Sequence, residues 1–393
     1  MIQAAVLFCY PWDFRDEGVD AVIGRARDLG VTHLAVATSY HAGFFFHPHN
    51  PKQRVHLLDD GVVYFHPNEA CYADGPIRPV VAAMSREQDW IRVIADAADR
   101  AGLKLMAWTV LLHNTRLGLV HPEATIQNAF GDSYPHALSP AHPASVALAK
   151  GLVRDLATHH PFEAILLEAS NYRNRAHGGT WVTGHHHERM GIHFRPVERA
   201  LLDLSFNPAD MDQATAAGVD VAALRVAVRD HLEQYMTAAP DVPAALAETV
   251  EQFTDRYPAL ADYDAHFCRT EAALLGQLRE VAKEHRVDLV GSADPAIDVV
   301  MKGVYGEPLP SIATITDEAR AALLPSQRLM ITLRLGFYGP GMGTPIVTES
   351  QMVEATRTAA AHGADMVAFY NYAEAPRRCV DWIKPALASG IMA

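Results

Sequence analysis

The segment "AAVLFCYPWDFRDEGVDAVIGRARDLGVTHLAVAT" (4–38) decides the fold. It begins with an apolar run (4–10), continues with an amphipathic stretch (16–30) and closes with a second apolar run (32–38). Short apolar runs are typical of buried strands, and the stretch between them has helical spacing and ends at Gly30. The segment therefore predicts a strand, a helix and a second strand, in that order.

The same alternation recurs along the chain. We expect further strands at 103–112, 164–168, 287–294, 311–316, 329–337 and 364–372, with helices at 85–102 and 144–160 among them. Strands that are apolar on both faces and alternate with helices form parallel sheets covered by helices. About eight such units predict an α/β fold, a (β/α)8 TIM barrel. An open doubly wound sheet is the alternative, but the first strand is followed by no glycine-rich phosphate-binding pattern.

The length of the chain adds long loops to this barrel. The chain has 393 residues, whereas a typical barrel takes about 250. The surplus lies in the loops after the second, third and fourth strands and in a mostly helical stretch at 196–286. We expect one barrel domain over 1–393, with 196–286 as a helical insertion within it.

The loop at 44–79 is long and rich in aromatic residues and proline. It carries Tyr64, His66, Asp74 and Arg78. Loops of this length inside a domain are usually functional or disordered, and the apolar content favours order. We expect this loop to fold over the mouth of the barrel as part of a substrate wall, with a small hairpin at 62–65.

Charge and cysteine content exclude several classes of protein. The formal net charge is -13, and no run of Lys or Arg offsets it, which argues against nucleic-acid binding. The four cysteines are far apart and form no CxxC pair, so neither a structural zinc site nor a disulfide framework is expected. No segment reaches the length of a membrane span, and the short N-terminal apolar run lacks a basic region before it. We expect a cytoplasmic protein.

Polar and aromatic residues stand where the predicted strands end. Because the carboxyl ends of parallel barrel strands meet at one face, we expect these side chains to line one mouth. Aromatic faces beside amide, guanidinium and imidazole groups suit a sugar, which has apolar faces and polar edges. Each residue alone is better explained as a loop residue that caps a helix or turn, and only the set as a whole indicates a binding site. The candidate sugar-binding residues are Trp12, Asp13, Tyr40, His41, Tyr64, Trp108, His113, Asn171, His185, His187, Arg334, Tyr370 and Asn371.

One predicted strand ends on a carboxylate. In "EAILLEASNYRNRAHGGTWVTGHHHERMG" (163–191) the apolar run stops at Glu168 and a polar segment follows. Burial tunes the pKa of such a group, and glycoside cleavage needs two carboxylates on opposite sides of one bond. Candidates for the second are Asp294, Glu188 and Asp13, and Asp294 is favoured because it ends the next predicted strand. The alternative is that Asp294 caps a helix beginning at Pro295.

The histidine-rich segment supports two interpretations. In an extended chain His185 and His187 point the same way, which suits either metal ligation or hydrogen bonds to sugar hydroxyls. The segment has no HxxxH or HExxH spacing, so we predict no catalytic metal and no cofactor.

Several segments together resemble a group of bacterial proteins described as glycoside-hydrolase-like barrels. They are "FGDSYPHALSPAHPASVALAKGLVRDLA" (130–157), "AILLEASNY" (164–172), "GHHHERMGI" (184–192), "AFYNY" (368–372) and "DWI" (381–383). The resemblance covers most of the chain and implies a (β/α)8 fold with a carbohydrate-active site. Several related barrel glycosidase clans carry a catalytic carboxylate on strand four, which implies that role for Glu168. Those clans often show Asn-Glu or an Asp there, whereas Leu167 precedes Glu168 here.

Three functions are therefore weighed. The first is a glycoside hydrolase with a carboxylate pair at the mouth, acting on a small carbohydrate. The second is a metal-dependent barrel enzyme of the sugar isomerase or amidohydrolase type, and the third is a non-catalytic sugar-binding barrel. In each case we expect neither a nucleic-acid nor a membrane partner, and a homo-oligomer stays open.

Overall fold

Eight parallel strands form a closed barrel in the computed structural model, which describes residues 1–172, 194–238, 248–305, 307–336, 348–389 and 392. β1 pairs with both β14 and β2, and this closes the barrel in the order β1, β14, β13, β12, β11, β10, β7, β2. The predicted (β/α)8 fold is confirmed, and the open sheet is excluded. The strands are β1 (Ala4–Cys9), β2 (His33–Tyr40), β7 (Lys104–Val110), β10 (Ala164–Glu168), β11 (Asp288–Gly291), β12 (Val299–Gly303), β13 (Arg328–Arg334) and β14 (Met366–Tyr370).

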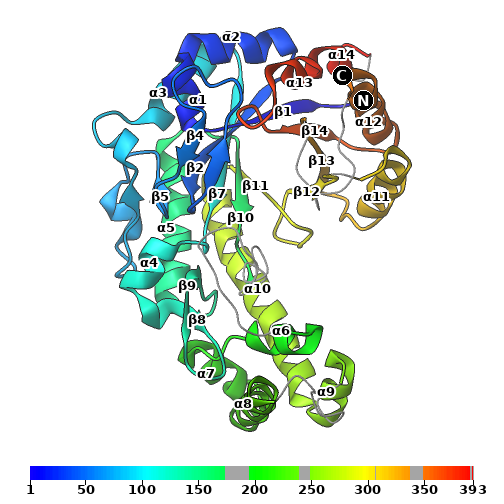
Figure 1. The fold of residues 1–393 in the computed structure, drawn as a ribbon. Helices are drawn as coiled ribbons and strands as arrows, with labels where there is room; N and C mark the ends of the chain where they lie inside the picture. The colour runs from blue at the N-terminus through cyan, green and yellow to red at the C-terminus, as the bar shows by residue number, and fades with distance from the viewer. Residues whose placement is uncertain (173–193, 239–247, 306, 337–347, 390–391, 393) are drawn as a thin grey trace.

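Helices surround the barrel strands (Figure 1). Their apolar sides pack on the strands, and this forms one large core with the barrel interior. They are α1 (Pro11–Glu17), α2 (Val19–Leu29), α3 (Trp90–Arg100), α5 (Pro143–His159), α10 (Ala259–Glu284), α11 (Leu309–Ala321), α12 (Glu349–Ala361), α13 (Arg377–Asp381) and α14 (Ile383–Leu387). None of the helices in the described part of the chain combines the length and apolar character that a membrane crossing needs.

The sixth strand differs from the sequence prediction. The segment 311–316 lies within α11, where Ile312 and Thr316 are both buried one helical turn apart. The strand is instead β12, which pairs with β11 and β13. The chain from 292 to 298 turns without a helix between β11 and β12, so the helix considered after Pro295 does not form. The β-branched residues Ile and Thr in 311–316 favour a strand in the sequence, whereas packing against the barrel stabilises a helix there.

The loop after β2 contains a hairpin, but not at the predicted residues 62–65. The observed hairpin consists of β3 (Phe44–Phe46) and β4 (Val55–Leu57). The residues predicted for it extend the sheet instead: β5 (Val62–Val63) pairs with β2, and β6 (Val80–Val81) pairs with β5. Two short 3-10 helices, η1 (Glu69–Tyr72) and η2 (Ala83–Ser85), complete the loop.

The helical segment has an apolar cluster of its own. α6 (Pro196–Leu202), α7 (Pro208–Ala216), α8 (Val221–Thr237) and α9 (Val250–Arg256) gather at the far end of α10, away from the barrel strands (Figure 1). Their cluster also takes residues from the loop after β7, which holds α4 (Thr115–Val120), η3 (Pro122–Ala124) and the β8 (Thr125–Gln127)–β9 (Ser133–Leu138) hairpin. α10 links the clusters, because Leu260 belongs to this one and Leu278 to the barrel core. The assignment of 1–393 to one domain stays a prediction.

Candidate active site

An aromatic cluster fills the mouth of the barrel around Trp108 of β7. The Trp108 ring centroid lies 5.2 Å from that of Tyr10, 5.1 Å from that of Tyr40 and 5.7 Å from that of Tyr370. These tyrosines follow or end β1, β2 and β14, and β1 and β14 do not pair with β7. Trp108 therefore points into the barrel interior, where strands from the opposite wall reach it.

Glu168 lies in this interior. The indole Nε1–H of Trp108 donates to Glu168 Oε2 at 2.5 Å. Side chains alternate along a strand, so Leu167 faces the helices while Glu168 faces the mouth. Glu168 is partly exposed, whereas Trp108 is only 2% exposed. The buried indole thus holds the carboxylate in place and leaves part of it within reach of a ligand.

A second carboxylate in this region is Glu374, which the sequence analysis did not single out. Glu374 Oε1 accepts from the Tyr10 hydroxyl at 2.9 Å and from Asn371 Nδ2 at 2.8 Å. Its backbone N–H donates to Asn371 Oδ1 at 2.8 Å. The loop after β14 therefore folds so that Asn371 presents Glu374 to Tyr10. The signal for it was available, since Glu374 is the first carboxylate after the last strand.

Glu168 and Glu374 both raise the pKa of the same tyrosines. Burial raises the pKa of Tyr40 and Tyr370, and the negative charges of both carboxylates raise it further. Both phenols are therefore neutral near neutral pH and available as hydrogen-bond donors or acceptors. The contacts agree with this: Trp108 donates to Glu168, Tyr10 donates to Glu374, and the two rings lie 5.2 Å apart, so both carboxylates border one aromatic cluster.

The rim of this site is polar and reaches solvent. Tyr305 follows β12 and is 37% exposed, and its ring centroid lies 5.6 Å from that of Tyr370. The guanidinium carbon of Arg334, at the end of β13, lies 5.6 Å from the centroid of Tyr305. An accessible aromatic face beside a guanidinium group suits a ligand with apolar faces and hydroxyl edges.

Asp294 lies on the other side of β10 from Glu168. It borders a cavity of about 260 Å³ with Asn171, Leu167 and, from α10, Leu275. Because Leu167 faces the helices, this cavity lies outside the barrel interior. Asp294 Oδ1 accepts from the N–H of Ala296 at 2.8 Å, so the carboxylate holds the turn between β11 and β12.

Asp13 stabilises the junction between β1 and α1. Its Oδ2 accepts from the N–H of Tyr10 at 2.8 Å, which links the start of α1 to the end of β1. The side chain is almost fully buried, and burial raises the pKa of this carboxyl well above its ordinary value. Asp13 therefore fixes the position of Tyr10, and through it that of Glu374.

Two of the candidate histidines stack on each other. The rings of His41 and His113 lie 4.4 Å apart and 16° from parallel, and His41 also contacts the ring of Tyr40 at 4.5 Å. His41 Nδ1 lies 2.6 Å from the carbonyl oxygen of Ala42 and donates to it. Both side chains are buried. His41 therefore packs against Tyr40, and a role of His41 and His113 in sugar binding stays a prediction.

The loop after β2 packs on the mouth through Trp12. The ring of Trp12 stacks on that of Tyr10 at 4.3 Å and meets the edge of Tyr64 at 5.7 Å. Its Nε1–H donates to His47 Nδ1 at 3.3 Å. The loop therefore packs against the barrel mouth, as expected, whereas its role as a substrate wall stays a prediction.

His47 gives this loop a predicted pH dependence. Burial, with the nearby charges of His56 and His49, lowers the pKa of His47 to about 3. The unfolded chain takes up this proton near pH 6.5. Between these two values the unfolded state binds more protons, so the free energy of unfolding falls as the pH falls.

We expect His47→Gln to reduce this loss, because Gln keeps an acceptor for Trp12 and does not titrate. From pH 6 to pH 5 the wild type should lose about 1 kcal/mol more than the variant. Urea unfolding at both pH values measures the difference. Equal losses in the two proteins would show that folding does not lower the pKa of His47.

Some candidates lie outside the described residues. They are His185, His187 and Glu188, all within 173–193. Among the residues that are described, the one trio of close metal-ligand side chains is Cys71, Asp155 and His159, on α5 and η1 rather than at the mouth.

No family model matches the sequence, and no curated protein matches it. Solved structures match the fold. They include an alpha-L-fucosidase isoenzyme 2 from Paenibacillus thiaminolyticus (TM-score 0.56, 13% identity, 98% of this chain and 49% of that one). They also include beta-galactosidases from Marinomonas ef1 (0.56, 13%, 98% and 59%) and from Halorubrum lacusprofundi (0.57, 11%, 98% and 58%).

These neighbours are glycoside hydrolases, and the chain spans about half to three-fifths of their lengths. At such low identity the likeness shows the fold alone. The fold expected from the resemblance to glycoside-hydrolase-like barrels is thereby confirmed.

Proposed function

We propose that this protein is a glycoside hydrolase that binds a small carbohydrate at the mouth of the barrel and cleaves a glycosidic bond between Glu168 and Glu374. The observation that carries the proposal is that both carboxylates border one aromatic cluster, Glu168 through Trp108 and Glu374 through Tyr10. Glycoside cleavage uses two carboxyl groups that flank the scissile bond. The fold shared with a fucosidase and beta-galactosidases supports the same class of reaction.

The hydrogen bonds suggest different roles for the two carboxylates. Glu374 Oε1 faces two donors, the Tyr10 hydroxyl and the Asn371 amide. This environment suits an ionised group that acts as nucleophile or base. Glu168 receives the single indole N–H of Trp108 and is partly exposed. We assign Glu168 as the acid that protonates the leaving oxygen, because strand four presents it directly to the mouth.

The rings around the pair provide the sugar contacts in this proposal. Tyr370 is partly exposed and Tyr305 is exposed, so both offer faces to an apolar side of a sugar. Arg334 adds a fixed cation with several N–H donors beside them. Trp108 is too deeply buried to stack on the ligand, so its role is to hold Glu168.

The pair of Glu168 with Asp294, favoured by the sequence, has less support. Asp294 borders a cavity on the helix side of β10 and bonds to its own turn. Two carboxyl groups separated by a strand cannot flank one glycosidic bond. Asp294 therefore serves best as the matched control carboxylate.

A panel of nitrophenyl glycosides tests the proposal. Fucosides, galactosides and glucosides of both anomers are incubated with the wild-type protein, and release of nitrophenol is followed by absorbance. We expect turnover of at least one member, which Glu168→Gln lowers strongly and Asp294→Asn retains. Turnover that depends on Asp294 and not on Glu168 would contradict the assignment.

A further inference from the structure

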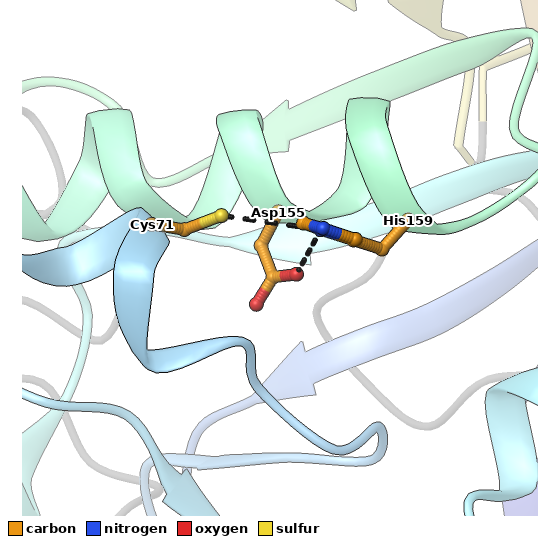
Figure 2. A group of neighbouring side chains, drawn as sticks. All are labelled: Cys71, Asp155 and His159. Atoms are coloured by element: carbon orange, nitrogen blue, oxygen red, sulfur yellow. Dashed lines mark hydrogen bonds and ion pairs between the residues drawn. The ribbon is translucent and has the colours of Figure 1, made fainter.

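A cluster on the outer wall of the barrel brings together three side chains that the proposed reaction does not use. Cys71 comes from η1, and Asp155 and His159 lie one turn apart on α5 (Figure 2). Cys71 Sγ lies 3.9 Å from His159 Nδ1, which in turn lies 3.0 Å from Asp155 Oδ1. The three ligand atoms all lie within 4.8 Å of one another. Cys71 and Asp155 are buried, and the side chain of His159 is 39% exposed, which gives solvent access to the group.

We propose that Cys71, Asp155 and His159 bind a zinc-like divalent cation. Tetrahedral zinc holds sulfur at about 2.3 Å and nitrogen or oxygen at about 2.0–2.2 Å, which separates adjacent ligand atoms by about 3.3–3.6 Å. The observed separations of 3.9 Å and 3.0 Å are within about 0.4 Å of that range. Formation of the site requires side-chain rotations, including a turn of the Asn68 amide, whose Nδ2 lies 2.9 Å from His159 Nε2, so that Nδ1 is free to bind the ion. A water molecule then completes the coordination.

The surroundings of Asp155 support this assignment. Asp155 Oδ2 accepts from the N–H of Asn68 at 2.9 Å and from the Tyr72 hydroxyl at 3.0 Å, which leaves Oδ1 directed at His159. Metal ligands in proteins are commonly oriented by such outer hydrogen bonds. The Asp155 side chain is fully buried, and no Lys or Arg in the described residues pairs with it. A divalent cation would balance the charge of this carboxylate.

The geometry disfavours the competing interpretation, a Cys–His–Asp nucleophilic triad. In such triads the nucleophile and the acid contact different ring nitrogens of the histidine. Here Cys71 Sγ and Asp155 Oδ1 both approach Nδ1, and Asn68 Nδ2 lies 2.9 Å from Nε2. The thiol and the carboxylate therefore do not lie on opposite sides of the ring, as a relay from thiol to acid requires.

The position of the group indicates a structural ion. η1 belongs to the loop between β2 and β7, and α5 connects β7 with β10. An ion bound by both would fix this loop to the outer wall of the barrel. We therefore expect zinc to stabilise the fold without taking part in the chemistry at the mouth.

Cobalt and zinc binding to the purified, chelator-treated full chain tests the proposal. Wild type should bind one zinc per chain by elemental analysis and show thiolate-to-cobalt charge-transfer absorption at one equivalent of Co²⁺. Zinc should raise the Tm by a few degrees. Cys71→Ser should lose the absorption, whereas Cys379→Ser, which replaces another buried cysteine, should keep it.

His159→Gln provides a second variant, since its partly exposed side chain is replaced with little risk to folding. It should weaken zinc binding at least tenfold. Absorption that persists in Cys71→Ser, or zinc binding that His159→Gln leaves unchanged, would overturn the proposal. A wild type that binds no zinc and shows no Tm shift would do the same.

Discussion

Replacement of Glu168 by glutamine is expected to lower turnover of a nitrophenyl glycoside by about 10²–10⁴-fold, the range of a positioned acid or base. Gln keeps the shape and still accepts the indole N–H of Trp108, so the fold should survive. Initial rates with saturating substrate measure kcat, and thermal unfolding followed by circular dichroism checks the fold. Asp294→Asn is the matched control and should retain kcat within a few-fold.

Two results would oppose the role of Glu168. Full activity in Glu168→Gln would remove the carboxylate from the chemistry. A Tm lowered together with the activity would instead indicate that Glu168 mainly holds Trp108 in place.

Glu374→Gln is expected to cause a loss of similar size, with a different dependence on the leaving group. If Glu374 is the nucleophile or base, its removal slows cleavage whatever the leaving group. Glu168 as the acid matters less when the leaving group needs no proton. We therefore expect dinitrophenyl glycosides to restore much of the activity of Glu168→Gln and little of that of Glu374→Gln.

The measurement is the kcat of each variant with nitrophenyl and with dinitrophenyl glycosides. Equal recovery with dinitrophenyl substrates in both variants would contradict the assignment of Glu168 as the acid and Glu374 as the nucleophile or base. It would still be consistent with both carboxylates taking part in the reaction. Wild-type kcat in Glu374→Gln would show that the second carboxylate lies elsewhere, and Glu188 would then be the next residue to replace.

Metal dependence of the activity distinguishes the proposed glycoside hydrolase from a metal-dependent barrel enzyme, the second function considered in the sequence analysis. A sugar isomerase or amidohydrolase type of enzyme would lose activity on removal of its metal. The proposed zinc site complicates this test, because wild type would lose zinc as well. Cys71→Ser separates the two, since a chelator should leave its glycoside turnover unchanged if the reaction uses the carboxylate pair alone.

The barrel could be predicted from the sequence because each strand is apolar on both faces and helices alternate with the strands. The strand β12 could not be located, since "VVMKG" is short and follows a proline-containing turn. The hairpin was misplaced for a related reason. Val62 and Val63 suit any strand, and only pairing with β2 shows which one they form.

The candidate site was predicted in part. Strand ends led to Glu168, Trp108, Tyr40 and Tyr370, which the structure brings together. The sequence could not tell which face Asp294 occupies, because the face depends on strand register and turn geometry. Cys71 and His159 lie 88 residues apart, so spacing gives no sign of their contact.

The structure of the Glu168→Gln protein soaked with a substrate it cannot cleave tests the central claim most directly. The account predicts a sugar ring against Tyr305 and Tyr370, with its glycosidic oxygen between residue 168 and Glu374. The separation of the two carboxyl groups in the wild type would then give the outcome, retention at about 5–5.5 Å or inversion at about 6.5–9.5 Å. A sugar bound in the cavity of Asp294 and Asn171, with the mouth between Glu168 and Glu374 unoccupied, would contradict the account.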